Sequence, residues 1–111
     1  LDRLPAPRPL QRRAAGDGVV DLTVRNLAMS TAMAVHHQRT GDHEQQGKSE
    51  RVTQRCNDLL QMLEPEDVKK RLETLLAATK GEGDDVEFLA RWGYDEQQKA
   101  AIAAAVLAVA Q

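Results

Sequence analysis

Two apolar stripes separated by one proline constrain the fold of this chain more than any other feature. In residues 52–63 the apolar positions recur at the spacing of one face of an α-helix, at Val52, Cys56, Leu59, Leu60 and Leu63. The same spacing returns after the break, at Val68, Leu72, Leu75, Leu76 and Thr79. Pro65 disfavours helical geometry in the residue before it and suits the first turn of the helix that follows. The pattern therefore predicts two amphipathic helices joined as an αα-hairpin.

Each helix of this hairpin would bury only one face, so other helices are needed to close a core. We expect them at residues 21–38, 85–92 and 96–110, besides the hairpin helices at 48–63 and 66–79. Few β-branched residues alternate with polar ones, as they would in a strand. The predicted fold class is therefore all-α, a single small bundle of four to five helices.

Aspartates mark the expected starts of three helices. Asp21 suits the N-cap of the first long helix. Asp84 is followed three residues later by Glu87, and Asp95 is followed by Gln98 at the same spacing. Because a side chain at the third helical position can bond back to the cap, each pair predicts a capping box.

The first 18 residues differ in composition from the rest of the chain. They contain three of the four prolines and four arginines, and proline at positions 5, 7 and 9 opposes a regular helix. We therefore divide the chain into an extended, flexible arm or linker at 1–18 and a helical bundle domain at 19–111. If the arm is functional, its arginines would supply charge for phosphate contacts: Arg3, Arg8, Arg12 and Arg13. Otherwise the arm is a solvated linker.

Three histidines, His36, His37 and His43, crowd a junction at residues 40–48 that interrupts the apolar periodicity and is expected to form a loop. Their spacing matches no compact ligand pattern for zinc or nickel. We therefore predict no metal site and interpret them as exposed residues near a helix end. Cys56 lies on an apolar stripe, which indicates an inert core thiol in a reducing compartment, the cytoplasm.

Recognisable catalytic motifs are missing from the sequence. It contains no P-loop, no dinucleotide-binding glycine motif, no Gly-x-Ser-x-Gly elbow and no His-Glu-x-x-His motif. We therefore expect no enzymatic activity, no cofactor and no small-molecule substrate. No apolar run approaches the length of a membrane span, so we expect no membrane interaction either.

The leading functional hypothesis is a non-catalytic protein–protein interaction module, a regulatory, adaptor or assembly domain that can form part of a larger protein. Met29 and Met33 widen the apolar surface of the first long helix, and such side chains either fill a core or accept a partner helix. The last helix is rich in alanine, and Ala103 and Leu107 are candidates for packing against another subunit. We expect a protein partner or self-association through these four residues.

The alternative hypothesis is a nucleic-acid-associated helical accessory domain of a replication, mobilisation or packaging protein. Lys48, Arg51 and Arg55 are about one helical turn apart and would form a basic row for phosphate contacts, together with the arginines of the arm. The overall charge does not favour this hypothesis, because 15 basic and 17 acidic residues leave a formal net charge of −2. The distribution of charge therefore matters more here than its sum.

Overall fold

The computed structural model describes the backbone of residues 9–110 and the side chains of residues 18–110. This part of the chain forms five helices and no strand, which confirms the prediction of an all-α bundle. The helices are α1 (Pro9–Thr40), α2 (His43–Leu60), α3 (Pro65–Thr79), α4 (Val86–Arg91) and α5 (Glu96–Ala110).

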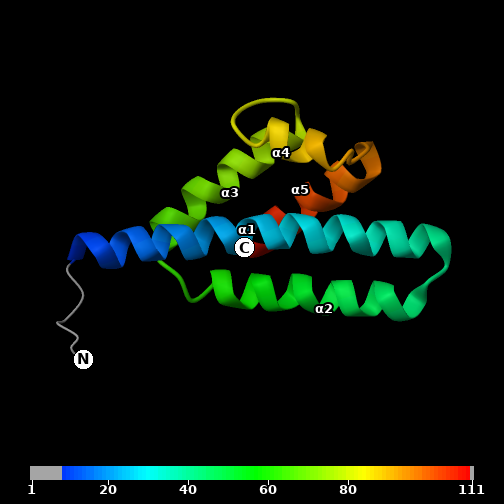
Figure 1. Ribbon diagram of the computed structural model, residues 1–111, viewed down its shortest axis with the longest axis horizontal. Helices are drawn as coiled ribbons and strands as arrows, with labels where there is room; N and C mark the ends of the chain where they lie inside the picture. The colour runs from blue at the N-terminus through cyan, green and yellow to red at the C-terminus, as the bar shows by residue number, and fades with distance from the viewer. Residues whose placement is uncertain (1–8, 111) are drawn as a thin grey trace.

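Helix α1 is the centre of the bundle. It runs the length of the molecule, with α2 packed along one side and α3, α4 and α5 on the other side (Figure 1). Four apolar residues of α1 are completely buried: Val24, Leu27, Ala28 and Ala32. The remaining core positions come from the apolar stripes of α3 and α5, including Leu75, Ile102 and Val106. A helix that is covered from two sides needs a wide apolar surface, and the small alanines let the neighbouring helices approach closely.

The predicted hairpin of the second and third helices is wrong. Helix α2 packs against α1 as an antiparallel hairpin, whereas α3 packs against α5 and α1. Ser30 and Thr31 of α1 are buried in the α1/α2 contact, and the hydroxyl groups of Ser30 and Thr53 share a hydrogen bond of 2.7 Å. Small hydroxyl side chains allow this close approach because each can also bond to a carbonyl of its own helix, as Thr31 does to Leu27.

The apolar stripe of α2 is therefore only partly buried. Cys56 and Leu60 lie in the core, but Val52 and Leu59 are exposed. The reason is that α2 contacts α1 along its length and α5 only slightly, so one flank of its stripe has no helix to cover it. The stripe of α3 is better covered, because α3 lies between α1 and α5.

The first helix begins earlier than predicted. Residues 9–18 continue α1 instead of forming part of an extended arm, and Asp21 lies inside the helix, where it does not cap a terminus. Pro9 is the first residue of α1, a position where proline costs no hydrogen bond and has a suitable φ angle. Residues 1–8, the remainder of the predicted arm, lie outside the described part of the chain.

The predicted loop at 40–48 is also shorter than expected. Gly41 has a φ of 77°, a left-handed conformation that reverses the chain after α1. Helix α2 then begins at His43, because the carboxylate of Asp42 caps it by accepting a hydrogen bond of 3.1 Å from the amide of Gln45. Gly47 lies within α2 and does not interrupt this helix.

The two predicted capping boxes have different outcomes. Asp84 does not cap α4; the N-cap is Asp85, whose carboxylate binds Arg71 instead of the helix amides. The box at α5 is confirmed, since the amide of Gln98 donates to Asp95 and the amide of Asp95 donates to Gln98, at 2.9 and 3.0 Å. Arg39 at the end of α1 donates to the same carboxylate of Asp95, with distances of 2.8 and 2.9 Å.

We expect this contact to make the stability of the protein depend on pH in the acid range. The hydrogen bond from Arg39, followed by the bond from the Gln98 amide, lowers the pKa of Asp95 from 3.8 to about 2. A lowered pKa means that the stabilisation is complete above about pH 4 and is lost as the pH falls toward 2. We expect Asp95→Asn, which retains the capping oxygen but not the charge, to lower the Tm at pH 7, with the difference from wild type closing below pH 4.

The measurement is thermal unfolding by circular dichroism across this pH range. Asp84→Asn is the matched control, because Asp84 is exposed and forms no ion pair with another described residue. A Tm difference between wild type and Asp95→Asn that is the same at pH 2 and pH 7 would contradict the expectation.

Candidate interaction surfaces

An exposed apolar surface crosses the pair formed by α1 and α2. We call it the α1/α2 apolar face, and its residues are Val19, Leu22, Met29, Met33, Val52 and Leu59. Leu22 is 60% exposed and Met33 is 43% exposed, whereas Met29 is half-buried. The α1 members recur at intervals of three, seven and four residues, so they share one side of the helix. This side is the part of α1 that neither α2 nor the α3/α5 layer covers.

The contact between the two helices brings the α1 and α2 members of this face together. Met29 and Met33 line a shallow hollow of about 240 Å³ with Lys48 and Val52. Leu59 is seven residues after Val52 and therefore lies on the same side of α2, two turns further along. The antiparallel arrangement places the C-terminal end of α2 beside the N-terminal half of α1.

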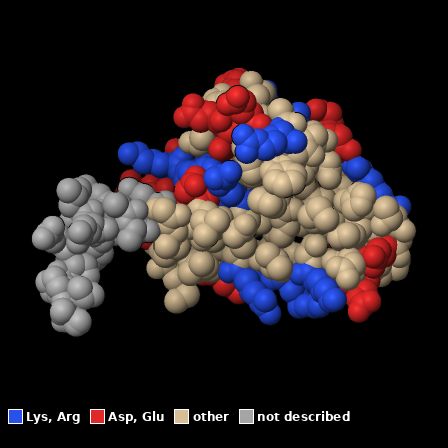
Figure 2. Space-filling model, in the orientation of Figure 1, with Lys and Arg blue, Asp and Glu red and all other residues tan. Residues whose placement is uncertain are grey.

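A basic row borders the α1/α2 apolar face on its α2 side. It consists of Lys48, Arg51 and Arg55, which are all exposed and are the only basic residues of α2 apart from His43. Figure 2 shows Lys and Arg atoms along this edge of the molecule, next to a broad surface without charged residues. No ion pair joins any of the three to another residue in the described part of the chain.

The opposite border of the α1/α2 apolar face also has a basic residue, Arg25, but its guanidinium already contacts Phe88 and Asp21. The Arg25 guanidinium lies 5.1 Å from the centre of the Phe88 ring and 3.8 Å from Asp21. A cation over an aromatic ring is held in place by the electrostatic attraction of the ring face. Arg25 therefore belongs to the packing of α1 against α4, and the free positive charge beside the apolar face is concentrated on α2.

A second apolar surface lies between α3 and α5. We call it the α3/α5 groove; it has a volume of about 570 Å³, and Leu63, Val68, Leu72, Leu76, Val106 and Leu107 contribute its apolar lining. Lys69 and Glu73 also line it, and both are exposed. Met62, at the turn between α2 and α3, is 81% exposed.

The structure divides the predicted partner-binding residues between these two surfaces. Met29 and Met33 belong to the α1/α2 apolar face, whereas Leu107 lines the α3/α5 groove and is 50% exposed. Ala103 is half-buried on α5 and lines neither surface. Leu22 was not among the residues predicted from the sequence to bind a partner. The signal was present, since Leu22 is seven residues before Met29.

The predicted nucleic-acid-binding residues are only partly described. Lys48, Arg51 and Arg55 form the basic row on α2. Arg12 and Arg13 lie in the helical backbone of α1, but their side chains are outside the described part of the chain, and Arg8 lies outside it entirely. The two groups are therefore not brought together by any described contact.

The ionisable residues of the described part form no cluster that suits a metal ion. No group of three or more His, Cys, Asp and Glu side chains converges among these residues. His36 and His37 stack edge to face with ring centres 5.4 Å apart, and both His36 and His43 are exposed. Burial raises the pKa of the Cys56 thiol, which disfavours the reactive thiolate.

Among residues 9–110, no helix combines the length and the apolar character needed to cross a membrane. Neither the curated proteins nor the solved structures include a match to the chain. A protein-family model does match, over residues 2–109. Because this match takes in nearly the whole chain, the protein belongs to the family described as Uncharacterised conserved protein UCP020893.

Proposed function

We propose that this domain is a non-catalytic interaction module whose α1/α2 apolar face binds an amphipathic helix of a protein partner, with acidic residues along one edge of that helix. The observation that supports the proposal is the combination of exposed Leu22, Met33, Val52 and Leu59 with the basic row on α2. Such a module would serve as a regulatory, adaptor or assembly domain. The free thiol of Cys56 favours a reducing compartment, the cytoplasm, for this activity.

The shape and chemistry of the face suit a helical ligand. Two packed helices offer a shallow channel along their line of contact, and a partner helix would place its anchors at i, i+3, i+4 and i+7 in that channel. Met29 and Met33 flank the hollow, and methionine side chains adapt to irregular partners because they are unbranched and polarisable. Apolar side chains that gather at a surface hollow, as Met29, Met33 and Val52 do, are typical of a protein-interaction site.

The basic row indicates the charge of the partner helix. Lys48, Arg51 and Arg55 are positioned to meet carboxylates on a helix that is seated on the adjoining apolar residues. Complementary charge at the rim of an interface accelerates association and excludes partners of the wrong charge. We therefore infer that the partner helix has Glu or Asp along the edge that faces α2.

A synthetic peptide pair tests this proposal. One peptide is an amphipathic helix with leucine anchors and glutamates along one flank, and the other has lysines in place of those glutamates. We expect the glutamate peptide to bind in fluorescence anisotropy and the lysine peptide to bind much more weakly. Met33→Glu is expected to weaken binding of the glutamate peptide by about thirtyfold, the effect of losing a central anchor worth about 2 kcal/mol.

Two further variants make the test specific. Leu107→Glu introduces the same charge at an exposed leucine on another surface, so it should leave peptide binding unchanged. Reversing Lys48 and Arg55 to glutamate should transfer the preference to the lysine peptide, because the sign of the rim is then inverted. Equal binding of both peptides by wild type, or no effect of Met33→Glu, would contradict the proposal.

The second candidate function is binding of nucleic-acid phosphates by the basic row, and the exposure of all three cations on one edge of α2 favours it. It predicts that labelled oligonucleotides bind at low salt and dissociate steeply as salt rises. Replacing Arg51 and Arg55 by alanine would then weaken oligonucleotide binding. Phosphate binding needs no apolar anchor, so Met33→Glu would affect it only through the added negative charge. Absence of oligonucleotide binding at low salt would eliminate this candidate.

A further inference from the structure

We propose that the protein forms a two-fold symmetric dimer in which the α3/α5 groove of one copy docks against the same groove of a second copy. The α3/α5 groove is a different surface from the α1/α2 apolar face, so the dimer does not depend on the proposed partner helix. Its occupant is a second copy of this chain, and the charges at the rim of the groove identify it.

The groove leaves apolar side chains exposed that the fold itself does not cover. Leu107, which lines the groove from α5, is 50% exposed. Met62, at the turn that precedes α3, is 81% exposed. The hollow of about 570 Å³ has a lining drawn mainly from apolar residues of α3 and α5. Exposed apolar side chains beside an apolar hollow can fill the same hollow on another copy, which is the self-complementarity that a two-fold interface requires.

Two charges on α3 specify how the copies would be arranged. Lys69 and Glu73 are exposed, line the groove, and lie four residues apart on the side of α3 that also carries Leu72 and Leu76. When two α3 helices pack antiparallel across a two-fold axis at the level of Arg71, midway between positions 69 and 73, Lys69 of each copy faces Glu73 of the other. Opposite charges one turn apart thus become two equivalent ion pairs, so the rim of the groove is complementary to itself.

A dimer formed in this way leaves the α1/α2 apolar face free on both copies. None of the residues of that face lines the α3/α5 groove. Each dimer would therefore present two equivalent binding faces, and a partner with two helices would be bound more tightly through the higher effective concentration of the second site.

Analytical ultracentrifugation of the full chain tests the dimer. We expect the mass to rise with concentration from that of the 12.3 kDa chain to twice that value. Leu107→Glu should leave only monomer, because it buries a charge in the interface, whereas Leu22→Glu on the other surface should dimerise like wild type. Circular dichroism melting verifies that the variants are folded.

A charge exchange tests the arrangement independently of any effect on folding. Lys69→Glu and Glu73→Lys, made singly, each place like charges opposite one another and are expected to weaken the dimer by about tenfold. The double variant restores opposite charges across the axis and should recover the wild-type dissociation constant. A monomer at every concentration overturns the proposal, as does a dimer that Leu107→Glu leaves intact or a double variant without recovery. Peptide binding by the α1/α2 apolar face is measured separately and is unaffected by either result.

Discussion

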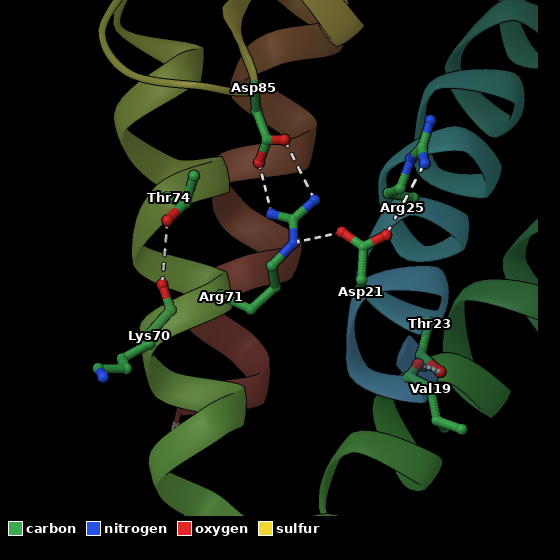
Figure 3. A network of polar contacts seen from close by, with 8 residues as sticks. All are labelled: Val19, Asp21, Thr23, Arg25, Lys70, Arg71, Thr74 and Asp85. Carbon is green, nitrogen blue, oxygen red and sulfur yellow. Dashed lines mark hydrogen bonds and ion pairs between the residues drawn. The ribbon is translucent and has the colours of Figure 1, made fainter. Parts of the chain in front are cut away.

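Replacing Arg71 by alanine is expected to lower the free energy of unfolding by about 3 kcal/mol, because it breaks a buried ion-pair network. The guanidinium of Arg71 extends from α3 and binds Asp85 through both terminal nitrogens, at 2.5 and 3.1 Å, and Asp21 of α1 through Nε at 2.9 Å (Figure 3). Asp85 is only 8% exposed. Without Arg71 its carboxylate is left in the interior with no cation, and that desolvation is the main cause of the expected loss.

The geometry of this network depends on the planar guanidinium of Arg71, whose three nitrogens donate in fixed directions. Burial by itself lowers the pKa of Arg71, but hydrogen bonds to Asp85 and Asp21 outweigh this effect, so the pKa is raised and the side chain stays charged. A lysine has one compact ammonium group that cannot make the bidentate contact to Asp85 and also bond to Asp21. We therefore expect Arg71→Lys to recover only part of the stability.

Urea denaturation measures both variants. The matched control is Lys70→Ala, an exposed cation one residue earlier on the same helix, which should change stability by less than about 0.5 kcal/mol. If Arg71→Ala is as stable as Lys70→Ala, then the network contributes nothing to the fold.

The second large effect is expected at the centre of α1. Leu27→Ala should destabilise the protein by about 3 kcal/mol, since Leu27 is completely buried and truncation of a buried leucine leaves a cavity that the surrounding helices fill only in part. Leu22→Ala removes the same atoms from the same helix, five residues earlier. Because Leu22 is largely exposed, this variant should stay within about 0.5 kcal/mol of wild type.

The comparison of these two leucines by urea denaturation tests the position of α1 in the bundle. A large difference between the two variants is expected only if α1 is covered on the side of Leu27 and open on the side of Leu22. Equal losses would mean that the α1/α2 apolar face is buried in solution, in a dimer or another assembly. Repeating the denaturation at several protein concentrations distinguishes these cases, because only an assembly makes the midpoint depend on concentration.

Caps and breakers in the sequence predicted the starts of α3 and α5 correctly but misplaced those of α1 and α4. Pro65 correctly marked the start of α3, and the Asp95 and Gln98 pair correctly marked the start of α5. The start of α1 was predicted too late, because three prolines were taken as evidence against a helix although Pro9 suits its first turn. Asp84 was assigned a cap that α4 lacks, because its neighbour Asp85 is drawn to Arg71 by a contact from another helix.

The candidate surfaces were only half predictable. Met29 and Met33 were identified because they widen the apolar surface of the first long helix, and Leu107 because it lies on the alanine-rich last helix. Val52 and Leu59 were assigned to the core, since nothing in an apolar stripe tells which of its members a neighbouring helix will cover. The basic row was visible in the sequence, but its place beside an apolar surface depends on the packing of α2 against α1.

The all-α class and most of the helices follow from apolar periodicity, caps and proline, because each of these signals acts within a few residues of the chain. Which helices pack against each other could not be predicted in the same way. An apolar stripe shows that a helix must be covered but not by which neighbour, and the choice depends on how closely two surfaces can approach. Because Ser30 and Thr31 are small, α2 can approach α1 closely, and it packs against α1 and not against α3. That pairing left Leu22, Met33, Val52 and Leu59 uncovered on one face of the molecule.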